Sequence, residues 1–374
     1  MKSLTPLLAI SFLIGCDGEK GNVAPSKDSI EEATSETKPP EAVSVNPNLK
    51  YVIKGDTVTI TDCDEAATGE LVIPDTIGGN PVTSIGERAF DQCGSLTSIT
   101  IPDSVTRIGS GAFFGCTSLT SITIGNGVTS IGKNAFEQCR SMTSITIPDG
   151  VTSIGDFAFQ FCESLTSISI PDSVTSIGEG AFLVYAGTLT AAEIGQLTTI
   201  EVGAENLNYA DVNGVLFNKE KTVLHTYPAG KTGDNYVIAN SVTSIGGYAF
   251  IGCSSLTGIT IPDGVTSIGD GAFAECTSLT SVTIPDSVNS IGDIAFGGCT
   301  SMTSITIPDG VTSIGGMAFM GCSSLSAVTF LGDAPKIGAN AFKESSPTIY
   351  READAKGWSD TLAGRPVKLI TEKP

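Results

Sequence analysis

Residues 96–116 read LTSITIPDSVTRIGSGAFFGC. Leu96, Ile99 and Ile101 are apolar and the residues between them are Ser or Thr, a pattern that favours a β-strand with one buried face. Pro102 ends this strand because proline has no amide proton to donate to a ladder. The run that follows, residues 105–108, predicts a second short strand.

The rest of the stretch brings the chain back toward its start. Gly109 allows a turn, and we expect Ala112, Phe113 and Cys116 to form one helical turn that directs the Phe and Cys side chains inward. A core of about seven side chains is too small to hold such a unit together by itself. We therefore expect copies of the unit to stack about 4.8 Å apart and to bury matching ladders of side chains.

Copies of this stretch follow one another with a period of 23 residues, which is the mark of a solenoid. Phe90 and Phe342 are separated by about eleven periods, so the chain holds about twelve coils. Two coils between Phe182 and Phe250 lack the Phe. The ten coils that keep it carry Phe90, Phe113, Phe136, Phe159, Phe182, Phe250, Phe273, Phe296, Phe319 and Phe342.

Most of the ten cysteines share this period. Zinc ligands within one knuckle are two to four residues apart, so the spacing is not that of a zinc finger. Cysteine packs well as a small apolar residue, and parallel side chains in a ladder have poor disulfide geometry. We therefore expect buried free thiols, while the state of Cys63, in the N-terminal cap, is left open. The periodic thiols are Cys93, Cys116, Cys139, Cys162, Cys253, Cys276, Cys299 and Cys322.

The recurring pattern LxxIxIPxxVxxIGxxAFxxC resembles the BspA-type leucine-rich repeat, also called the Treponema pallidum type. The resemblance runs from Asn80 to Lys343 and lapses only in residues 183–236. It implies a β-rich solenoid of leucine-rich repeat coils, each with two short strands plus a helical turn, and caps at both ends. It also implies a secreted or surface protein, and this family is often linked to adhesion.

The N-terminal residues, MKSLTPLLAISFLIG, carry one base and a short apolar run, as a secretory signal does, and are too short to span a membrane. Leu13-Ile14-Gly15-Cys16 resembles the bacterial lipobox, which implies cleavage before Cys16 and lipidation of its thiol. We therefore expect an exported bacterial lipoprotein of the cell envelope or surface. Asp17 leaves the choice between inner and outer membrane open.

The chain divides into five predicted segments. The signal peptide covers residues 1–15, and the lipidated Cys with a disordered tether covers 16–48, where acidic and small polar residues cannot build a core. A hairpin signal around Gly55-Asp56 places an N-terminal β cap at 49–80. The solenoid covers 81–342, with irregular coils at 183–236, and a C-terminal cap covers 343–374.

Several chemistries are excluded by composition and spacing. The net charge is -20, so nucleic-acid binding is not expected. Gly230-Lys231-Thr232 lacks the earlier Gly of a nucleotide-binding loop, and Asp211-Val212-Asn213-Gly214 lacks the final Glu of a calcium loop. His225 is the only histidine, which excludes a His-His zinc site. We predict no cofactor, no metal site and no nucleotide ligand.

Positions around each Ala-Phe pair vary between coils, although packing explains the monotony of the rest. Apolar residues repeated along one exposed edge form a patch of the kind that marks an interaction site. In the other interpretation, these side chains fold over and cover the predicted helical turn. The candidate partner-binding strip consists of Phe114, Phe157, Phe161, Tyr248, Ile251, Ile294, Met317 and Met320.

Two further rows repeat on the predicted surface. One Asp follows the Pro of many coils, either to shape the turn or as a weak cation ladder, at Asp103, Asp149, Asp172, Asp263, Asp286 and Asp309. Outward hydroxyls form either a solvated strand face or a lattice that matches a glycan, mineral or ice surface. They include Thr97, Thr100, Thr120, Thr123, Thr143, Thr146, Thr280 and Thr283.

The sequence thus predicts a non-enzymatic, lipid-anchored surface protein whose solenoid is an adhesion or protein- and matrix-interaction module. Adhesion rests on the family resemblance. Three alternatives stay open: carbohydrate or mineral binding along the hydroxyl rows, a structural scaffold in the envelope, and a hydrolase that uses the irregular region around His225.

Overall fold

The computed structural model describes residues 45–183 and 196–373. The predicted signal peptide, Cys16 and most of the predicted tether lie outside the described residues, as does part of the irregular segment. Within the described ranges, no helix has the length and apolar character needed to cross a membrane.

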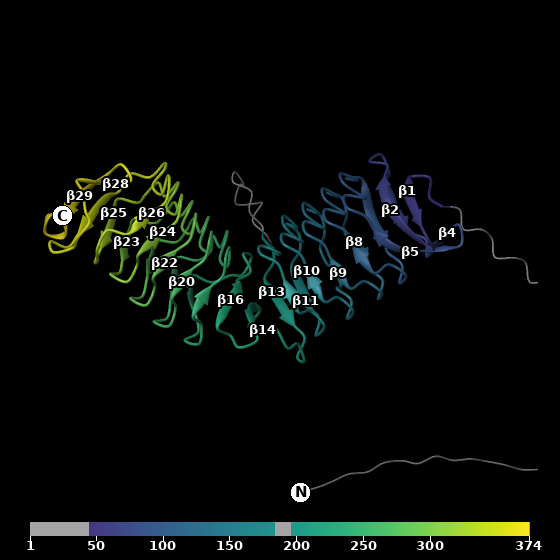
Figure 1. The fold of residues 1–374 in the computed structure, drawn as a ribbon, viewed down its shortest axis with the longest axis horizontal. Helices are drawn as coiled ribbons and strands as arrows, with labels where there is room; N and C mark the ends of the chain where they lie inside the picture. The colour runs from purple at the N-terminus through teal and green to yellow at the C-terminus, as the bar shows by residue number, and fades with distance from the viewer. Residues whose placement is uncertain (1–44, 184–195, 374) are drawn as a thin grey trace, which may run out of the picture. The chain divides into compact units, whose positions relative to one another are not determined.

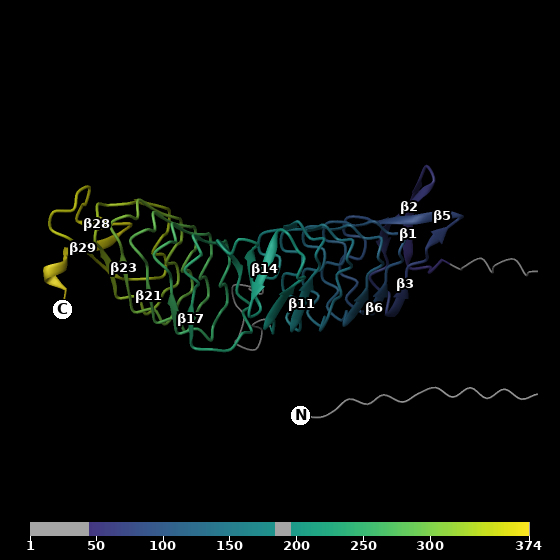
Figure 2. The same cartoon turned by 90° about the horizontal axis from the view of Figure 1, so that it is seen from below.

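Residues 45–183 and 196–373 form a β-solenoid, as predicted, whose coils lie side by side in Figures 1 and 2. Each complete coil has three sides. We call them the Ser-Ile face, the Thr face and the Phe side, after the residues that recur on them.

Two sheets build the Ser-Ile face. The first consists of β1 (Leu49–Lys54), β2 (Thr57–Cys63), β5 (Asn80–Ile85), β7 (Arg107–Ile108), β9 (Ser130–Ile131), β10 (Ser153–Ile154) and β12 (Ser176–Ile177), with β4 (Thr76–Ile77) paired to β5. The second consists of β14 (Tyr209–Val212), β15 (Val215–Asn218), β16 (Val223–Thr226), β18 (Ser244–Ile245), β20 (Ser267–Ile268), β22 (Ser290–Ile291), β24 (Ser313–Ile314) and β26 (Lys336–Ile337).

Three sheets build the Thr face. The first two contain β3 (Gly69–Val72), β6 (Leu96–Thr100) and β8 (Ser121–Thr123), and then β11 (Ser167–Ile170) with β13 (Thr199–Val202). The third contains β17 (Asn235–Val237), β19 (Gly258–Thr260), β21 (Ser281–Thr283), β23 (Ser304–Ile307), β25 (Ala327–Phe330), β27 (Thr348–Arg351), β29 (Arg365–Leu369) and β28 (Thr361–Leu362). A short 3-10 helix, η2 (Ile370–Glu372), follows β29.

The register between complete coils equals the sequence period. In β9 and β10, for example, Ser130 pairs with Ser153 and Ile131 with Ile154, in parallel. Because the shift is always one whole period, each side chain meets its own counterpart in the next coil. The core is therefore a set of ladders, and the Phe rings stack with centroids 4.9 Å apart for Phe90 and Phe113. Tyr227 takes the place of Phe in one irregular coil and stacks on Phe250 at 5.2 Å.

The Phe side differs from the predicted helical turn. In the coil of residues 111–116, the amides of Gly111, Phe113 and Gly115 donate to carbonyls of the next coil at 2.8 Å. The intervening amides instead donate three residues back within their own coil. A helix would use every amide inside one coil and leave none to join its neighbour, so the chain forms consecutive turns here.

The glycine of the Ile-Gly pair is required by close approach of two coils. A Cβ on Gly155 would lie 2.5 Å from the Lys133 amide nitrogen, and one on Gly109 would lie 2.6 Å from a backbone carbon of Gly86. Both distances are shorter than side-chain contacts allow, so coils meet backbone to backbone at this column. Gly109 therefore serves close packing as well as the turn that the sequence predicts, because its carbonyl accepts the Ala112 amide over 3.3 Å.

The periodic cysteines are buried and free, as predicted, and so is Cys63, whose state the sequence left open. Their thiols also have a use that the sequence did not reveal. Cys116 donates to the Phe90 carbonyl of the preceding coil over 3.2 Å, and Cys299 does the same to Phe273 over 3.2 Å. Ser345 stands at this position in the last coil and donates to the Phe319 carbonyl over 2.6 Å. The Cys and Ser side chains at this position of the repeat are thus both small and both donate a hydrogen bond.

Both ends of the stack differ from the coils between them. β1 and β2 form an antiparallel hairpin whose second strand pairs with β5. At the other end, Trp358 donates to the Gly332 carbonyl over 3.3 Å and packs edge-on against Phe330. β27, β29 and β28 extend the Thr face beyond the last coil, while the Ser-Ile face ends at β26.

Candidate binding surfaces

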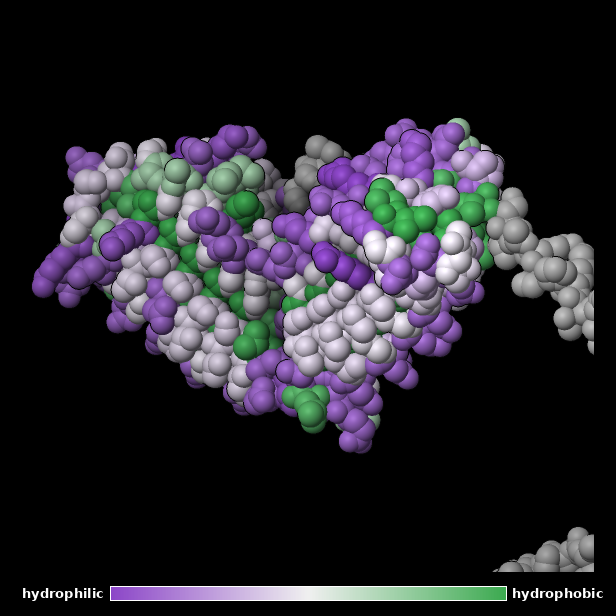
Figure 3. All heavy atoms as spheres, turned by 45° about the vertical axis from the view of Figure 1, so that its right-hand side comes forward, coloured by the Kyte–Doolittle hydropathy of each residue, from purple (hydrophilic) through white to green (hydrophobic). Residues whose placement is uncertain are grey.

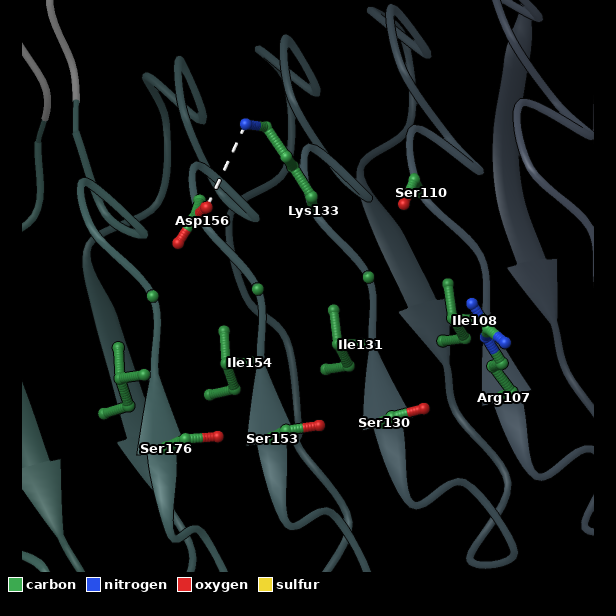
Figure 4. Close-up of a pocket in the computed structure, with 14 residues that line it drawn as sticks. Arg107, Ile108, Ser110, Ser130, Ile131, Lys133, Ser153, Ile154, Asp156 and Ser176 are labelled. Atoms are coloured by element: carbon green, nitrogen blue, oxygen red, sulfur yellow. Dashed lines mark ion pairs between the residues drawn. The ribbon is translucent and has the colours of Figure 1, made fainter.

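A hollow of about 600 Å³ lies on the Ser-Ile face of the first sheet (Figure 4). It runs across β7, β9, β10 and β12. Ser130, Ser153 and Ser176 point into it from successive strands, and Gly132, Gly155 and Gly178 also line it. The lining further includes Ile108, Ile131, Ile154 and Ile177, so the groove presents hydroxyl groups beside apolar carbon.

Charges flank this groove along one edge. Lys133 forms an ion pair with Asp156 over 3.9 Å, and its Nζ lies 5.5 Å from the ring centre of Phe157. Two coils earlier, the guanidinium carbon of Arg88 lies 5.5 Å from the ring centre of Phe114. Through these cation–π contacts, basic side chains lie over two aromatic rings of the candidate strip.

The structure brings part of the candidate strip together. Phe157, Tyr248 and Ile294 pack with buried Ile251 in one apolar cluster on the Phe side, which also contains Leu183 and Ala274. The Phe157 and Tyr248 rings meet edge to face at 6.4 Å. Phe114, Met317 and Met320 are half-buried outside this cluster, and Phe161 is buried.

Five of the eight strip residues have left-handed backbone, and one of them is buried Phe161, with φ of 58°. Phe157, Tyr248, Ile294 and Met317 stand two residues before a stacked ring and have φ between 55° and 57°. Such φ values cost a residue with a Cβ about 1–2 kcal/mol, and a β-branched Ile is a clear outlier there. At the equivalent position other coils carry Gly111, Gly180 and Gly271, Asn134 and Asn340, or Arg88, whose φ is 53°.

The Asp row serves the turns at two of its six positions. Asp103 accepts a hydrogen bond from the Asn126 amide over 2.7 Å, and Asp172 accepts one from the Glu205 amide over 3.0 Å. Each bond joins one turn to the next coil. Among the residues described, no three His, Cys, Asp or Glu side chains gather closely enough to hold a metal ion.

The hydroxyl rows lie on the Thr face in register. Thr100 pairs with Thr123, and Thr260 with Thr283, and all four are exposed. A further row is tied to the backbone, because the Thr120 hydroxyl donates to the Thr97 carbonyl over 3.0 Å. Pale, weakly polar surface of this kind is extensive in Figure 3, where green hydrophobic surface is limited to patches, one of them over the N-terminal cap.

His225 lies where the first Ser-Ile sheet ends. Its ring meets Tyr209 edge to face at 6.0 Å, and the Tyr209 hydroxyl accepts a hydrogen bond from the Ile177 amide over 2.8 Å. Burial lowers the pKa of His225, and a hydrogen bond to the Ile177 backbone opposes that shift. These contacts give His225 a structural role at the joint between β12 and the following strands.

The neighbouring motif Asp211-Val212-Asn213-Gly214 forms a hairpin turn between β14 and β15. Asn213 and Gly214 have φ of 52° and 77°, which is typical of a type I′ turn. The Asp211 carboxylate accepts the Val202 amide over 3.0 Å, so it is used inside the fold. Lys231 donates to the Asn213 carbonyl over 2.7 Å. The motifs that resembled calcium and phosphate loops therefore hold the joint together.

Sequence reasoning missed two features of this surface. It did not predict that the variable residue two positions before each Phe has left-handed backbone, which is energetically costly for a residue with a Cβ. Gly and Asn at the same position in other coils were the signal. It also missed the groove on the Ser-Ile face, because single Ser residues repeated every 23 positions carry no signal of a hollow.

Comparison with known proteins agrees with this architecture. The model of the BspA type leucine rich repeat region matches residues 83–204 and 230–348. A leucine rich cell surface protein from Faecalibacterium prausnitzii has 30% identity and a TM-score of 0.56, with 83% of this chain and 94% of that chain covered. A leucine-rich repeat protein from Eubacterium ventriosum has 27% identity and a TM-score of 0.51, covering 86% and 98%.

The pneumococcal vaccine antigen PcpA shares the fold at 22% identity, with a TM-score of 0.65, and the match covers 88% of this chain and 93% of that chain. No curated protein matches the chain at a significant level. The similar structures include a bacterial cell-surface leucine-rich repeat protein.

Proposed function

Because the chain belongs to the BspA-type leucine-rich repeat family, we propose that it is a non-enzymatic, lipid-anchored bacterial surface protein that binds a protein or matrix ligand through the strip on its Phe side. The cell-surface relative supports the location, and the lipobox at Cys16 supports the anchor. The inner or outer membrane stays open because of Asp17.

One observation carries the binding site. Phe157, Tyr248, Ile294 and Met317 hold φ values near 56° at a position where glycine is free of strain. Packing in the apolar cluster recovers part of the cost for three of them, but Met317 lies outside that cluster. Strain retained at a half-exposed apolar side chain points to use of that side chain.

Binding to immobilised fibronectin, fibrinogen, laminin and collagen tests this proposal. A variant with Asn at the four strained positions keeps the backbone, since Asn134 and Asn340 already stand there in other coils. We expect at least tenfold weaker binding to any protein that the parent binds. The matched control places four Asn on the Thr face, at Thr123, Thr146, Thr283 and Thr306. If both variants bind as the parent does, the strip is not the site.

The anchor is tested separately with Cys16→Ala. A thioether-linked diacylglyceryl group together with an N-acyl chain gives stable membrane attachment, which one chain alone does not. We expect the parent to partition into detergent after phase separation and the variant to stay in the aqueous phase. Equal partitioning of both would exclude lipidation at Cys16.

Glycan or mineral binding along the hydroxyl rows is the second candidate. The in-register pairing of exposed Thr100 with Thr123 and of Thr260 with Thr283 favours it. The control variant, with Asn at Thr123, Thr146, Thr283 and Thr306, removes part of this Thr lattice. A glycan-array signal that this control loses, and that the strip variant keeps, would assign the function to the Thr face.

A further inference from the structure

The last coil, residues 336–345, leaves a row of backbone donors without a partner. In the coil before it, the amides of Met317, Phe319 and Gly321 donate to carbonyls of the last coil over 2.8–2.9 Å. The equivalent amides of the last coil belong to Asn340, Phe342 and Glu344. Within the described part of the chain, these three have no hydrogen-bond acceptor.

A cavity of about 440 Å³ lies at this open end. It is lined by Ile337, Ala339, Asn340, Lys343, Ala363 and Arg365, among others. The C-terminal cap leaves it uncovered because β27 and β29 extend only the Thr face, whereas β26 is the last strand of the Ser-Ile face. The repeat thus stops with one side of its final coil unmatched.

Arg365 gives this end a cationic group. Its Nη2 donates to the Phe342 carbonyl over 2.8 Å, in the place that a Cys thiol fills elsewhere. Its Nε is buried, and the described residues offer it no hydrogen-bond partner. Lys343 lies beside it, more than half exposed, and forms an ion pair with Glu344 over 3.6 Å. An unpaired buried guanidinium nitrogen favours an acceptor, and a carboxylate suits it best.

The sequence around Arg365 and Lys343 also carries a net positive charge. Residues 336–373 contain seven bases and five acids, a net charge of +2, whereas residues 232–335 contain eight acids and no base. The open end is therefore a positive region that follows a negative one. It attracts acidic groups and orients them toward the final coil.

We propose that the open end of the last coil binds an acidic segment of a partner polypeptide. The amides of Asn340, Phe342 and Glu344 alternate along consecutive turns, as the donating amides of the coil before do, so they can donate to carbonyl oxygens of a bound segment. Acidic side chains of the segment then pair with Arg365 and Lys343. This site begins one coil beyond Met317 of the strip, whose amide donates to the Ala339 carbonyl, and it does not depend on the function proposed above.

Fluorescence anisotropy of the full mature chain tests the proposal. The probe is a fluorescein-labelled decapeptide of alternating Asp and Val, and decapeptides of alternating Lys and Val or Ser and Val are the comparisons. We expect binding of the Asp peptide alone, weakened by added salt. Equal binding of the Lys or Ser peptide, or no binding of the Asp peptide, would overturn the proposal.

Variants locate the site. Lys343→Glu should weaken binding of the Asp peptide at least tenfold, and Ala339→Trp should block it by filling the cavity. Lys356→Glu is the matched control, because it changes the net charge equally while its side chain does not line the cavity. Equal loss in Lys343→Glu and Lys356→Glu would reduce the effect to general charge and contradict the site.

Two further measurements separate other outcomes. The four-Asn strip variant should still bind the Asp peptide, so failure of the strip and failure of this site are distinguishable. Sedimentation velocity of the chain alone should show monomers at all concentrations. A concentration-dependent dimer that Lys343→Glu abolishes would assign the site to a second copy and overturn the assignment to a partner.

Discussion

At the residue scale, each invariant letter of the repeat meets one physical requirement. The Phe column supplies stacked rings, the Ile-Gly column allows close backbone contact, and the Cys column supplies a small donor. Ser345 in the last coil and Arg365 beyond it donate to the same kind of carbonyl. The monotony of the sequence is therefore a consequence of repetition, because every interior coil faces the same neighbours.

The donor role of the thiols predicts an order of substitutions at Cys299. Serine keeps a donor for the Phe273 carbonyl, whereas alanine loses it and leaves a small void. We expect Cys299→Ser to be more stable than Cys299→Ala by about 0.5–1.5 kcal/mol, the net value of one hydrogen bond. Urea unfolding measures this difference. A serine variant less stable than the alanine variant would show that the column selects only apolar volume.

The close contact at the glycine column predicts a strong position effect. In Gly155→Ala the new methyl meets the Lys133 backbone at 2.5 Å, whereas in Gly264→Ala the nearest atom is at 3.4 Å. We expect Gly155→Ala to lose about 1–3 kcal/mol or more through overpacking, and Gly264→Ala to stay within about 1 kcal/mol of the parent. Thermal unfolding of both variants is the measurement. Similar melting temperatures would contradict the packing argument.

At the scale of elements, the joint between β12 and β14 is the least regular part of the stack. Tyr209 and His225 replace ladder contacts there with side-chain hydrogen bonds. β15 pairs antiparallel with both β14 and β16, and β16 then pairs in parallel with β18. Local stability at the joint therefore depends on a few polar contacts and not on repeated ones.

The joint should weaken in mild acid. The pKa of His225 is lowered by burial in the folded state, so an unfolded chain takes up a proton first as the pH falls. His225 then stabilises the fold fully above pH of about 6.5, and this contribution is lost as the pH falls through the lower folded value. We expect the parent to lose more stability than His225→Gln between pH 7.5 and 5.5. Parallel curves for both proteins would contradict this sign.

The sequence alone was enough to predict the elements that depend on one coil and its period. The two strands, the inward Phe and Cys and the twelve-coil solenoid follow from alternation and spacing. The predicted helical turn was not found, because its amides are needed by the next coil, and local propensity near Ala112 and Phe113 does not register a neighbour 23 residues away. The joint and the open end also escaped prediction, since neither repeats.

At the scale of the whole molecule, the folded part carries two candidate surfaces of different chemistry. The Phe-side strip is apolar and strained, and the open end beyond β26 is polar and positive. Stability is close to a sum of neighbour terms in such a stack, so a single costly residue in one coil is tolerated by the others. This tolerance allows individual coils to carry binding residues that a single small core would not accept.

We propose that the strip keeps strained side chains because they bind a ligand. The most direct test measures unfolding and binding of Met317→Asn together, because Met317 lies outside the apolar cluster. Relief of strain should offset the lost burial, so we predict unchanged or higher stability with weaker binding to the matrix protein that the parent binds. If the variant is less stable by about 1 kcal/mol or more and binds as well as the parent, Met317 is a packing residue and not part of a binding site.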